Sequence, residues 1–127
     1  MIQDRFVTEV AQAIAGEAYS IPEYTNISNT IVSGDIDATD TTLIGEIGTR
    51  LAVTTSRISD SISYSAIRSA TTDLVSTSGD LIKGFGTFVS VSGGTDLMTQ
   101  VALDTPFTQT SSFDVELITT IDIARSS

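Results

Sequence analysis

The side chains that most often carry catalysis are absent from this sequence. It contains no histidine and no cysteine, so it lacks the commonest general base, the usual partner of a nucleophilic serine and the commonest zinc ligands. The only lysine, Lys83, has no serine one helical turn before it, which argues against a serine–lysine pair. We expect Lys83 instead to point outward from a strand and to discourage aggregation at a sheet edge. These residues predict a protein that is not an enzyme and needs no cofactor.

Carboxylates are the remaining side chains that can take part in catalysis or bind a metal ion. Asp35, Asp37 and Asp40 lie within six residues and offer the hard oxygens that Ca²⁺ prefers. The bidentate glutamate of a complete calcium loop is missing, so this is a weak calcium candidate beside the simpler interpretation of an acidic loop with a helix cap. Asp114 and Glu116 lie about 7 Å apart on one strand face, as a glycosidase pair might. No aromatic platform for a sugar accompanies them, which favours a solvated face.

Two short motifs are better explained by structure than by chemistry. Gly84-Phe85-Gly86 lacks the third glycine of a dinucleotide-binding turn, and no phosphate-binding lysine follows it. Glycines inside a strand indicate a bend or a close approach of another backbone. Asn26-Ile27-Ser28 is a glycosylation sequon, but three-residue sequons arise too often by chance to decide anything.

The first 18 residues have the periodicity of an amphipathic helix. Val7, Ala11 and Ala18 flank the apolar face, and Gly16 is expected to end the helix. The face is either one side of a core or a surface that docks into a neighbouring subunit. In the second case its partner-binding residues are Ile2, Phe6, Val10 and Ile14.

The pattern of residues 19–127 predicts a mainly β domain. Together with the N-terminal helix it is expected to form a single domain. A short helical turn is expected over Leu43–Ile47, closed by Gly48. Consecutive strands without helices between them call for an antiparallel β-sandwich, or a barrel-like closed sheet. The expected strands are Thr25–Val32, Thr49–Ser56, Asp60–Ser69, Leu81–Val91, Leu97–Leu103 and Phe113–Ile123.

The net charge of −10 excludes several classes of partner. Six scattered Lys and Arg residues cannot form the basic surface that nucleic acids or anionic membranes require. The first residues lack the layout of a signal peptide, and we expect synthesis in the cytoplasm. Aspartates outnumber glutamates about two to one. This excess fits an ordinary acidic β protein, a halophilic source or a basic partner.

The order of segments from Thr42 onward resembles a family of small structural proteins and tail-fibre N-terminal domains of tailed viruses. The segment Leu43-Ile44-Gly45-Glu46-Ile47-Gly48-Thr49-Arg50 is similar to a Leu-x-x-Glu-x-x-x-Arg helix that leads into a strand, here Leu51-Ala52-Val53-Thr54. Further similar segments, although Gly84 stands where the family has an acidic residue, are Ser61–Ala66, Ile82–Phe88, Gly93-Gly94 and Phe113–Ile123. The resemblance implies a β-sandwich in a virion, decorating a capsid or belonging to a tail, baseplate or fibre.

Two hypotheses of function follow. The first is a non-enzymatic, oligomeric virion subunit, made in the host cytoplasm, whose partners are copies of itself and other virion proteins. The second is a module for host recognition that binds a glycan or Ca²⁺ through the loops 34–40 or 71–79. The resemblance supports the first, and the aspartates of the 34–40 loop are the motive for the second.

Overall fold

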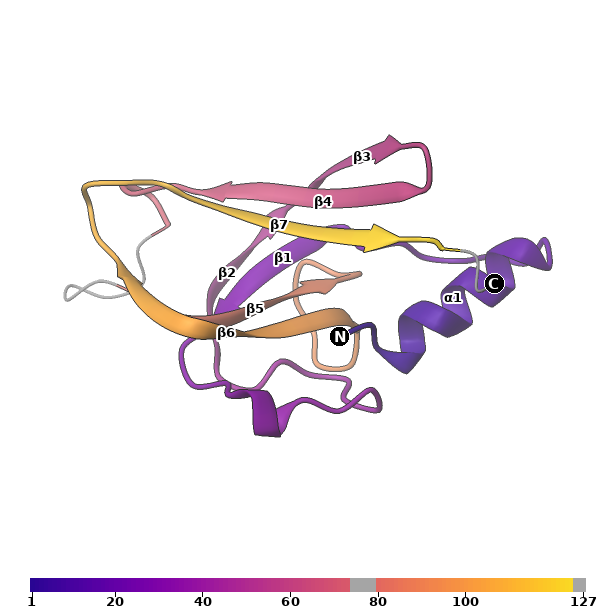
Figure 1. Ribbon diagram of the computed structural model, residues 1–127, viewed down its shortest axis with the longest axis horizontal. Coiled ribbons are helices and arrows are strands. Elements are labelled where there is room, and N and C mark those ends of the chain that lie inside the picture. The colour runs from indigo at the N-terminus through magenta and orange to yellow at the C-terminus, as the bar shows by residue number, and fades with distance from the viewer. Residues whose placement is uncertain (74–79, 125–127) are drawn as a thin grey trace.

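The computed structural model describes residues 1–73 and 80–124. They form two antiparallel sheets packed face to face, with helix α1 (Asp4–Ile14) beyond one end of the sheets (Figure 1). The sheet orders are β2-β1-β5-β6 and β3-β4-β7. The elements after α1 are β1 (Tyr24–Ser28), the 3₁₀ turn η1 (Ser33–Asp35), β2 (Glu46–Ala52), β3 (Thr54–Ile58), β4 (Ser61–Arg68), β5 (Asp80–Phe88), β6 (Leu97–Gln109) and β7 (Val115–Asp122). The predicted antiparallel sandwich is confirmed, and its sheets do not close into a barrel.

An apolar cluster between the two sheets holds the sandwich together. Alternate residues of β7 are buried against the first sheet, while the residues between them are exposed, as the alternating pattern of this segment predicts. Ile62, Tyr64 and Ala66 likewise share the inner face of β4, and Tyr64 is the most deeply buried of the three. The buried members of the inter-sheet cluster are Ile27, Ile82, Val115 and Leu117, and Ile47, Phe85 and Leu103 pack against them.

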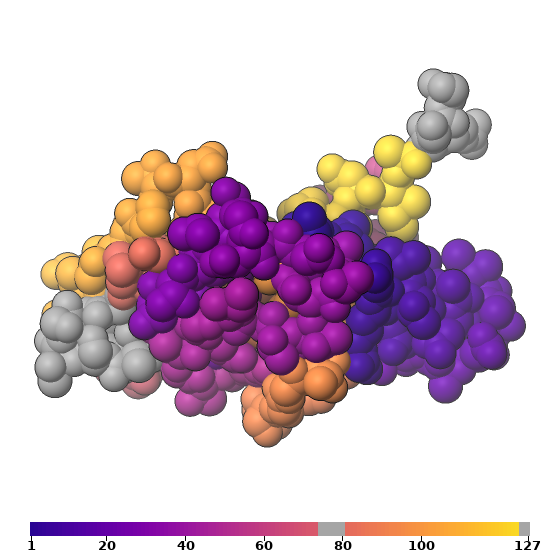
Figure 2. Space-filling view, turned by 90° about the horizontal axis from the view of Figure 1, so that it is seen from below, coloured from indigo at the N-terminus to yellow at the C-terminus, as the bar shows by residue number. Residues whose placement is uncertain are grey.

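The other face of the four-stranded sheet is covered by residues 29–45. Figure 2 shows this face from below, with the purple segment spread across the middle and the indigo helix projecting to one side. Ile31 and Leu43 of this segment are buried against Phe88 and Leu97 of the sheet. The four-stranded sheet therefore has an apolar layer on each face, which explains why β1 is buried almost throughout.

Several boundaries differ from the prediction. Leu43–Ile47 is not helical: Gly45 and Gly48 have φ angles of 68° and 74°, and from Glu46 the chain pairs with β1. A left-handed glycine on either side of Ile47 prevents a helical turn there. The single short helical turn is instead η1. Strand β6 continues to Gln109 because the chain after an irregularity near Pro106 rejoins the ladder with β5.

Helix α1 is shorter than the 18 residues predicted, because Ile2 pairs with Thr99 of β6 and lies outside the helix. None of the helices in the described ranges, 1–73 and 80–124, has the length and apolar character needed to cross a membrane.

Candidate docking surface

Helix α1 is hydrogen-bonded to the rest of the fold at its start, and its end is closed by bonds of its own. At its start the Asp4 N–H donates to the Ala38 carbonyl over 2.8 Å. At its end Gly16 adopts a φ of 77°, as predicted for the terminating residue, and its N–H donates to the Ala13 carbonyl. The Glu17 N–H donates to the Gln12 carbonyl, which completes a Schellman motif. Glu9 further accepts a hydrogen bond of 2.6 Å from the Ser20 N–H, so the helix cannot swing freely.

Helix α1 carries an exposed apolar face. No residue of this helix is buried, and Val7, Val10 and Ile14 are 60%, 39% and 84% exposed. With the exposed Ala11 they follow the spacing i, i+3, i+4, i+7 of a helix-packing face. We refer to Val7, Val10, Ala11 and Ile14 as the docking stripe. Water covers these side chains in the isolated chain, although their type and spacing suit contact with protein.

The partner-binding residues predicted from the sequence are only partly brought together. Val10 and Ile14 lie in the docking stripe, whereas Ile2 lies on the edge of β6. Phe6 is half-buried and lines a small cavity of about 160 Å³ between the helix and β4, whose wall also includes Val10, Ile14 and Tyr64. Burial raises the pKa of Tyr64 above its ordinary value. Sequence periodicity detected an apolar helix, but it could not tell which flank, here the one with Val7 and Ala11, faces water.

The three aspartates of the weak calcium candidate do not converge. Asp35 accepts the Val32 N–H and Asp40 accepts the Asp37 N–H, over 3.1 and 2.9 Å. Asp37 accepts both the N–H and the hydroxyl of Thr39, and the N–H bond and then the hydroxyl bond lower its pKa. Each carboxylate thus shapes its own loop. Across residues 1–73 and 80–124, no group of three or more carboxylates is arranged to hold a metal ion.

The structure also places the other side chains for which the sequence suggested a role, which are Lys83, Asp114 and Asn26. Lys83 lies on β5 at an irregularity of its ladder with β6, and the pairing of β5 with β1 begins only at Gly84, so its role at a sheet edge stays a prediction. Asp114 precedes β7 and accepts the Ala70 N–H over 2.7 Å, so it does not share a strand face with Glu116. Asn26 of the sequon is 1% exposed, and its amide donates to Glu46 over 2.7 Å.

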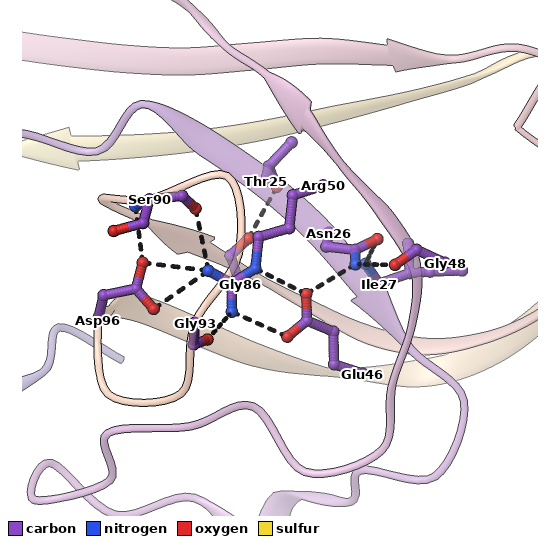
Figure 3. A network of polar contacts seen from close by, with 10 residues as sticks. All are labelled: Thr25, Asn26, Ile27, Glu46, Gly48, Arg50, Gly86, Ser90, Gly93 and Asp96. Carbon is purple, nitrogen blue, oxygen red and sulfur yellow. Dashed lines mark hydrogen bonds and ion pairs between the residues drawn. The ribbon is translucent and has the colours of Figure 1, made fainter.

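The most highly connected polar group is Arg50, shown in Figure 3. Its guanidinium donates to Glu46 through Nε and Nη2 over 2.8 and 3.0 Å, and to both oxygens of Asp96 through Nη1 over 3.0 and 3.1 Å. The same group donates to the Ser90 and Gly93 carbonyls and stacks 3.6 Å from the centre of the Phe88 ring. All its nitrogens are therefore occupied, and nothing remains to bind a substrate.

The pKa of Arg50 reflects this environment. Burial by itself lowers the pKa, but the hydrogen bonds and charges of Glu46 and Asp96 outweigh it and raise the pKa above the ordinary value. The guanidinium is permanently charged and joins β2 to the β5–β6 connection. The sequence could not identify this role, because a spacing of four residues brings side chains together on a helix but not on a regular strand. The irregular pairing of β1 with β2 between Thr25 and Ile27 accompanies the juxtaposition.

Comparison of the chain with known proteins found no relative: no protein-family model, curated protein or solved structure matches it.

Proposed function

We propose that the protein is a non-enzymatic structural subunit that assembles with other protein chains through the docking stripe of α1. The observation that carries this proposal is an exposed apolar helix face of four residues, on a helix that is hydrogen-bonded to Ala38 at its start and to Ser20 through Glu9. Apolar side chains that follow helix-packing spacing and face water are typical of interaction sites. A fixed helix also loses little conformational entropy on association.

The setting that we propose is the virion of a tailed virus, as a surface or appendage subunit of a capsid or tail. Its support is the resemblance of the segments from Thr42 onward to small structural proteins of such viruses, together with a sandwich fold of the kind that the resemblance implies. The proposed partners are copies of the chain and other virion proteins. The absence of histidine and cysteine from the sequence supports a role without catalysis.

The docking stripe is too small to account for a stable interface alone. An 11-residue helix is about 16 Å long, and a specific interface buries about 800 Å² on each partner. Burying each Val or Ile side chain contributes roughly 1.5 to 3 kcal/mol before the cost of association is subtracted. The sandwich must therefore contribute further contacts if the assembly is stable.

The test compares the mass of the wild-type chain in solution with that of two helix variants. Val7→Asp places a carboxylate in the docking stripe, and Thr8→Asp places the same group at the neighbouring exposed position. We expect the wild type and Thr8→Asp to form oligomers that Val7→Asp loses, as measured by sedimentation velocity from about 10 µM to 1 mM, a range that spans weak to moderate affinities. Circular dichroism checks that both variants keep the helix.

The proposal of self-association fails if the wild type stays monomeric over this range in both dilute buffer and molar NaCl. It also fails if Val7→Asp assembles as well as Thr8→Asp. For incorporation into particles, the same pair of variants is compared in a virus-infected host, and retention of Val7→Asp in purified particles contradicts docking through α1.

A further inference from the structure

One side of the sandwich is open between its two edge strands β6 and β7. A groove of about 450 Å³ runs there, and β7 contributes the unbroken run 118–122 to its wall. Figure 1 shows β6 in orange and β7 in yellow on this side, with the N-terminus near the start of β6. Most of the groove surface is apolar, contributed by Ile2, Phe85, Val101, Leu103, Ile118 and Ile121.

The edge of β6 is already largely occupied or distorted. Residues 1–3 run antiparallel beside it: the Gln3 N–H donates to the Met98 carbonyl and the Gln100 N–H to the Met1 carbonyl, both over 3.0 Å. Further along, the ladder with β5 is irregular opposite Ile82 to Gly84, and Pro106 lies in that part of β6. Proline and bulges are devices that blunt a sheet edge.

The edge of β7 has no such protection. All eight of its residues pair with β4 in unbroken register, and the strand contains no proline, glycine or lysine. The Ile123 N–H donates to the Asp60 carbonyl, and hydrogen-bonded and non-bonded pairs alternate along an antiparallel ladder. The backbone groups that point away from β4 are therefore those of Glu116, Ile118, Thr120 and Asp122.

The charged side chains of the two strands beside this edge, β6 and β7, are all acidic. Between Gly84 and Ala124 the sequence has no Lys or Arg and five carboxylates, of which Glu116 and Asp122 belong to β7 itself. A second copy of the chain is a poor occupant. A symmetric antiparallel pair of β7 strands centred on Thr119 sets Glu116 opposite Asp122 of the copy, and centring on Ile118 sets Asp114 opposite Asp122. Like charges directly opposite one another destabilise a strand pair.

We propose that the free edge of β7 binds an extended segment of another protein as an added strand. Alternate apolar side chains of that segment enter the groove, and its Lys or Arg side chains face Glu116 and Asp122. Main-chain hydrogen bonds supply affinity in strand addition, and the groove and the charges supply selectivity. This contact is separate from the docking stripe of α1, so either can exist without the other.

The probe is a fluorescein-labelled synthetic peptide, Lys-Ile-Thr-Ile-Thr-Ile-Lys, in which both Lys residues lie on the strand face opposite the Ile residues and six positions apart, as Glu116 and Asp122 are. Its counterpart has Glu in place of both Lys residues. Fluorescence anisotropy measures binding to the full chain. We expect the Lys peptide to bind at least about tenfold more tightly than the Glu peptide, which corresponds to 1.4 kcal/mol, and the preference to shrink with added salt. No binding of the Lys peptide below about 1 mM, or equal binding of both peptides, overturns the proposal.

Thr120→Pro tests the edge directly, because it removes an N–H that faces the groove side and is not used by β4. The matched control is Thr55→Pro, which removes an outward N–H from the edge of β3 on the opposite side of the same sheet. Thr120→Val keeps the N–H while removing the hydroxyl that contacts Ser63. We expect only Thr120→Pro to weaken Lys-peptide binding by about tenfold or more. Equal binding to Thr120→Pro and the wild type contradicts the added strand.

NMR of the wild-type chain maps the peptide-binding site directly. On addition of the Lys peptide, amide signals of Glu116, Ile118 and Thr120 should shift in a ¹⁵N NMR spectrum, whereas those of Thr55 and Arg57 on β3 should not. Val7→Asp should bind the peptide like the wild type, because the docking stripe is a different surface. If instead Thr120→Pro abolishes self-association and the Lys peptide does not compete, the edge serves a second copy and the proposed partner is wrong.

Discussion

At the scale of single residues, Arg50 links two parts of the chain that have few other connections. It lies on β2, yet its partners Ser90, Gly93 and Asp96 all belong to the connection between β5 and β6. Asp96 also accepts the Ser90 N–H over 2.6 Å. A planar guanidinium with five donors can satisfy two carboxylates and two carbonyls at once, and it can stack on an aromatic ring at the same time. In a chain without cysteine, this network fixes the connection where a disulfide is not possible.

Replacing Arg50 by lysine should therefore destabilise the fold although the charge is kept. A single ammonium group cannot reach both carboxylates and the two carbonyls, so buried acceptors lose their donors. We expect a loss of about 3 kcal/mol in the free energy of unfolding, measured by urea denaturation. Arg57→Lys is the matched control, because Arg57 is exposed and its side chain donates to the Ser59 carbonyl. A midpoint for Arg50→Lys equal to that of Arg57→Lys contradicts the proposed role.

At the scale of elements, the two glycines of β5 decide how closely residues 29–45 approach the sheet. A Cβ atom at Gly86 would lie 2.7 Å from the Thr99 carbonyl oxygen and 2.9 Å from Leu97 Cδ1. One at Gly84 would clash with the Val101 carbonyl and the Ile31 side chain. The interpretation of these glycines as positions of close backbone approach is confirmed. They let a segment with almost no regular structure of its own cover one face of the sheet.

We expect Gly86→Ala to destabilise the protein by about 1 to 3 kcal/mol, because backbone or buried side chains must move to admit the methyl group. Gly34→Ala is the control: it lies in the covering segment, and nothing stands within 4 Å of its added Cβ. That variant should stay within about 0.5 kcal/mol of the wild type. Thermal unfolding followed by circular dichroism separates the two variants, and a Gly86→Ala protein as stable as Gly34→Ala would show that Thr99 and Leu97 of β6 move aside at little cost.

Sequence patterns predicted the elements whose signal is local. The alternation along β7 and the helical period of α1 need no knowledge of the rest of the chain, and both elements were placed within a few residues. The prediction of a helical turn over Leu43–Ile47 was wrong, because pairing with β1 and two left-handed glycines override the helical pattern of this segment. The exposed side of α1 and the free edge of β7 depend on long-range neighbours, so no local pattern could reveal them.

At the scale of the whole molecule, the described surface is more acidic than the composition suggests. Two of the six basic residues are removed from the surface, since Arg50 and Arg68 are 8% and 1% exposed. The loop carboxylates Asp35 and Asp37 are exposed and accept only hydrogen bonds from their own loop. Glu116 and Asp122 at the edge of β7 are exposed as well. Mutual repulsion of such groups disfavours the compact state.

We therefore expect added salt to stabilise the chain. The Debye length falls from about 10 Å at 0.1 M salt to about 3 Å at 1 M, which screens repulsion between exposed carboxylates but affects buried pairs such as Arg50 with Asp96 much less. The melting temperature should rise with NaCl, by about 4 °C for each kcal/mol of repulsion relieved. Sucrose is the control, because it favours compact states without screening charge. An equal rise in sucrose and NaCl, or no rise in NaCl, contradicts the electrostatic origin and argues against a halophilic source, one of the three interpretations of the aspartate excess.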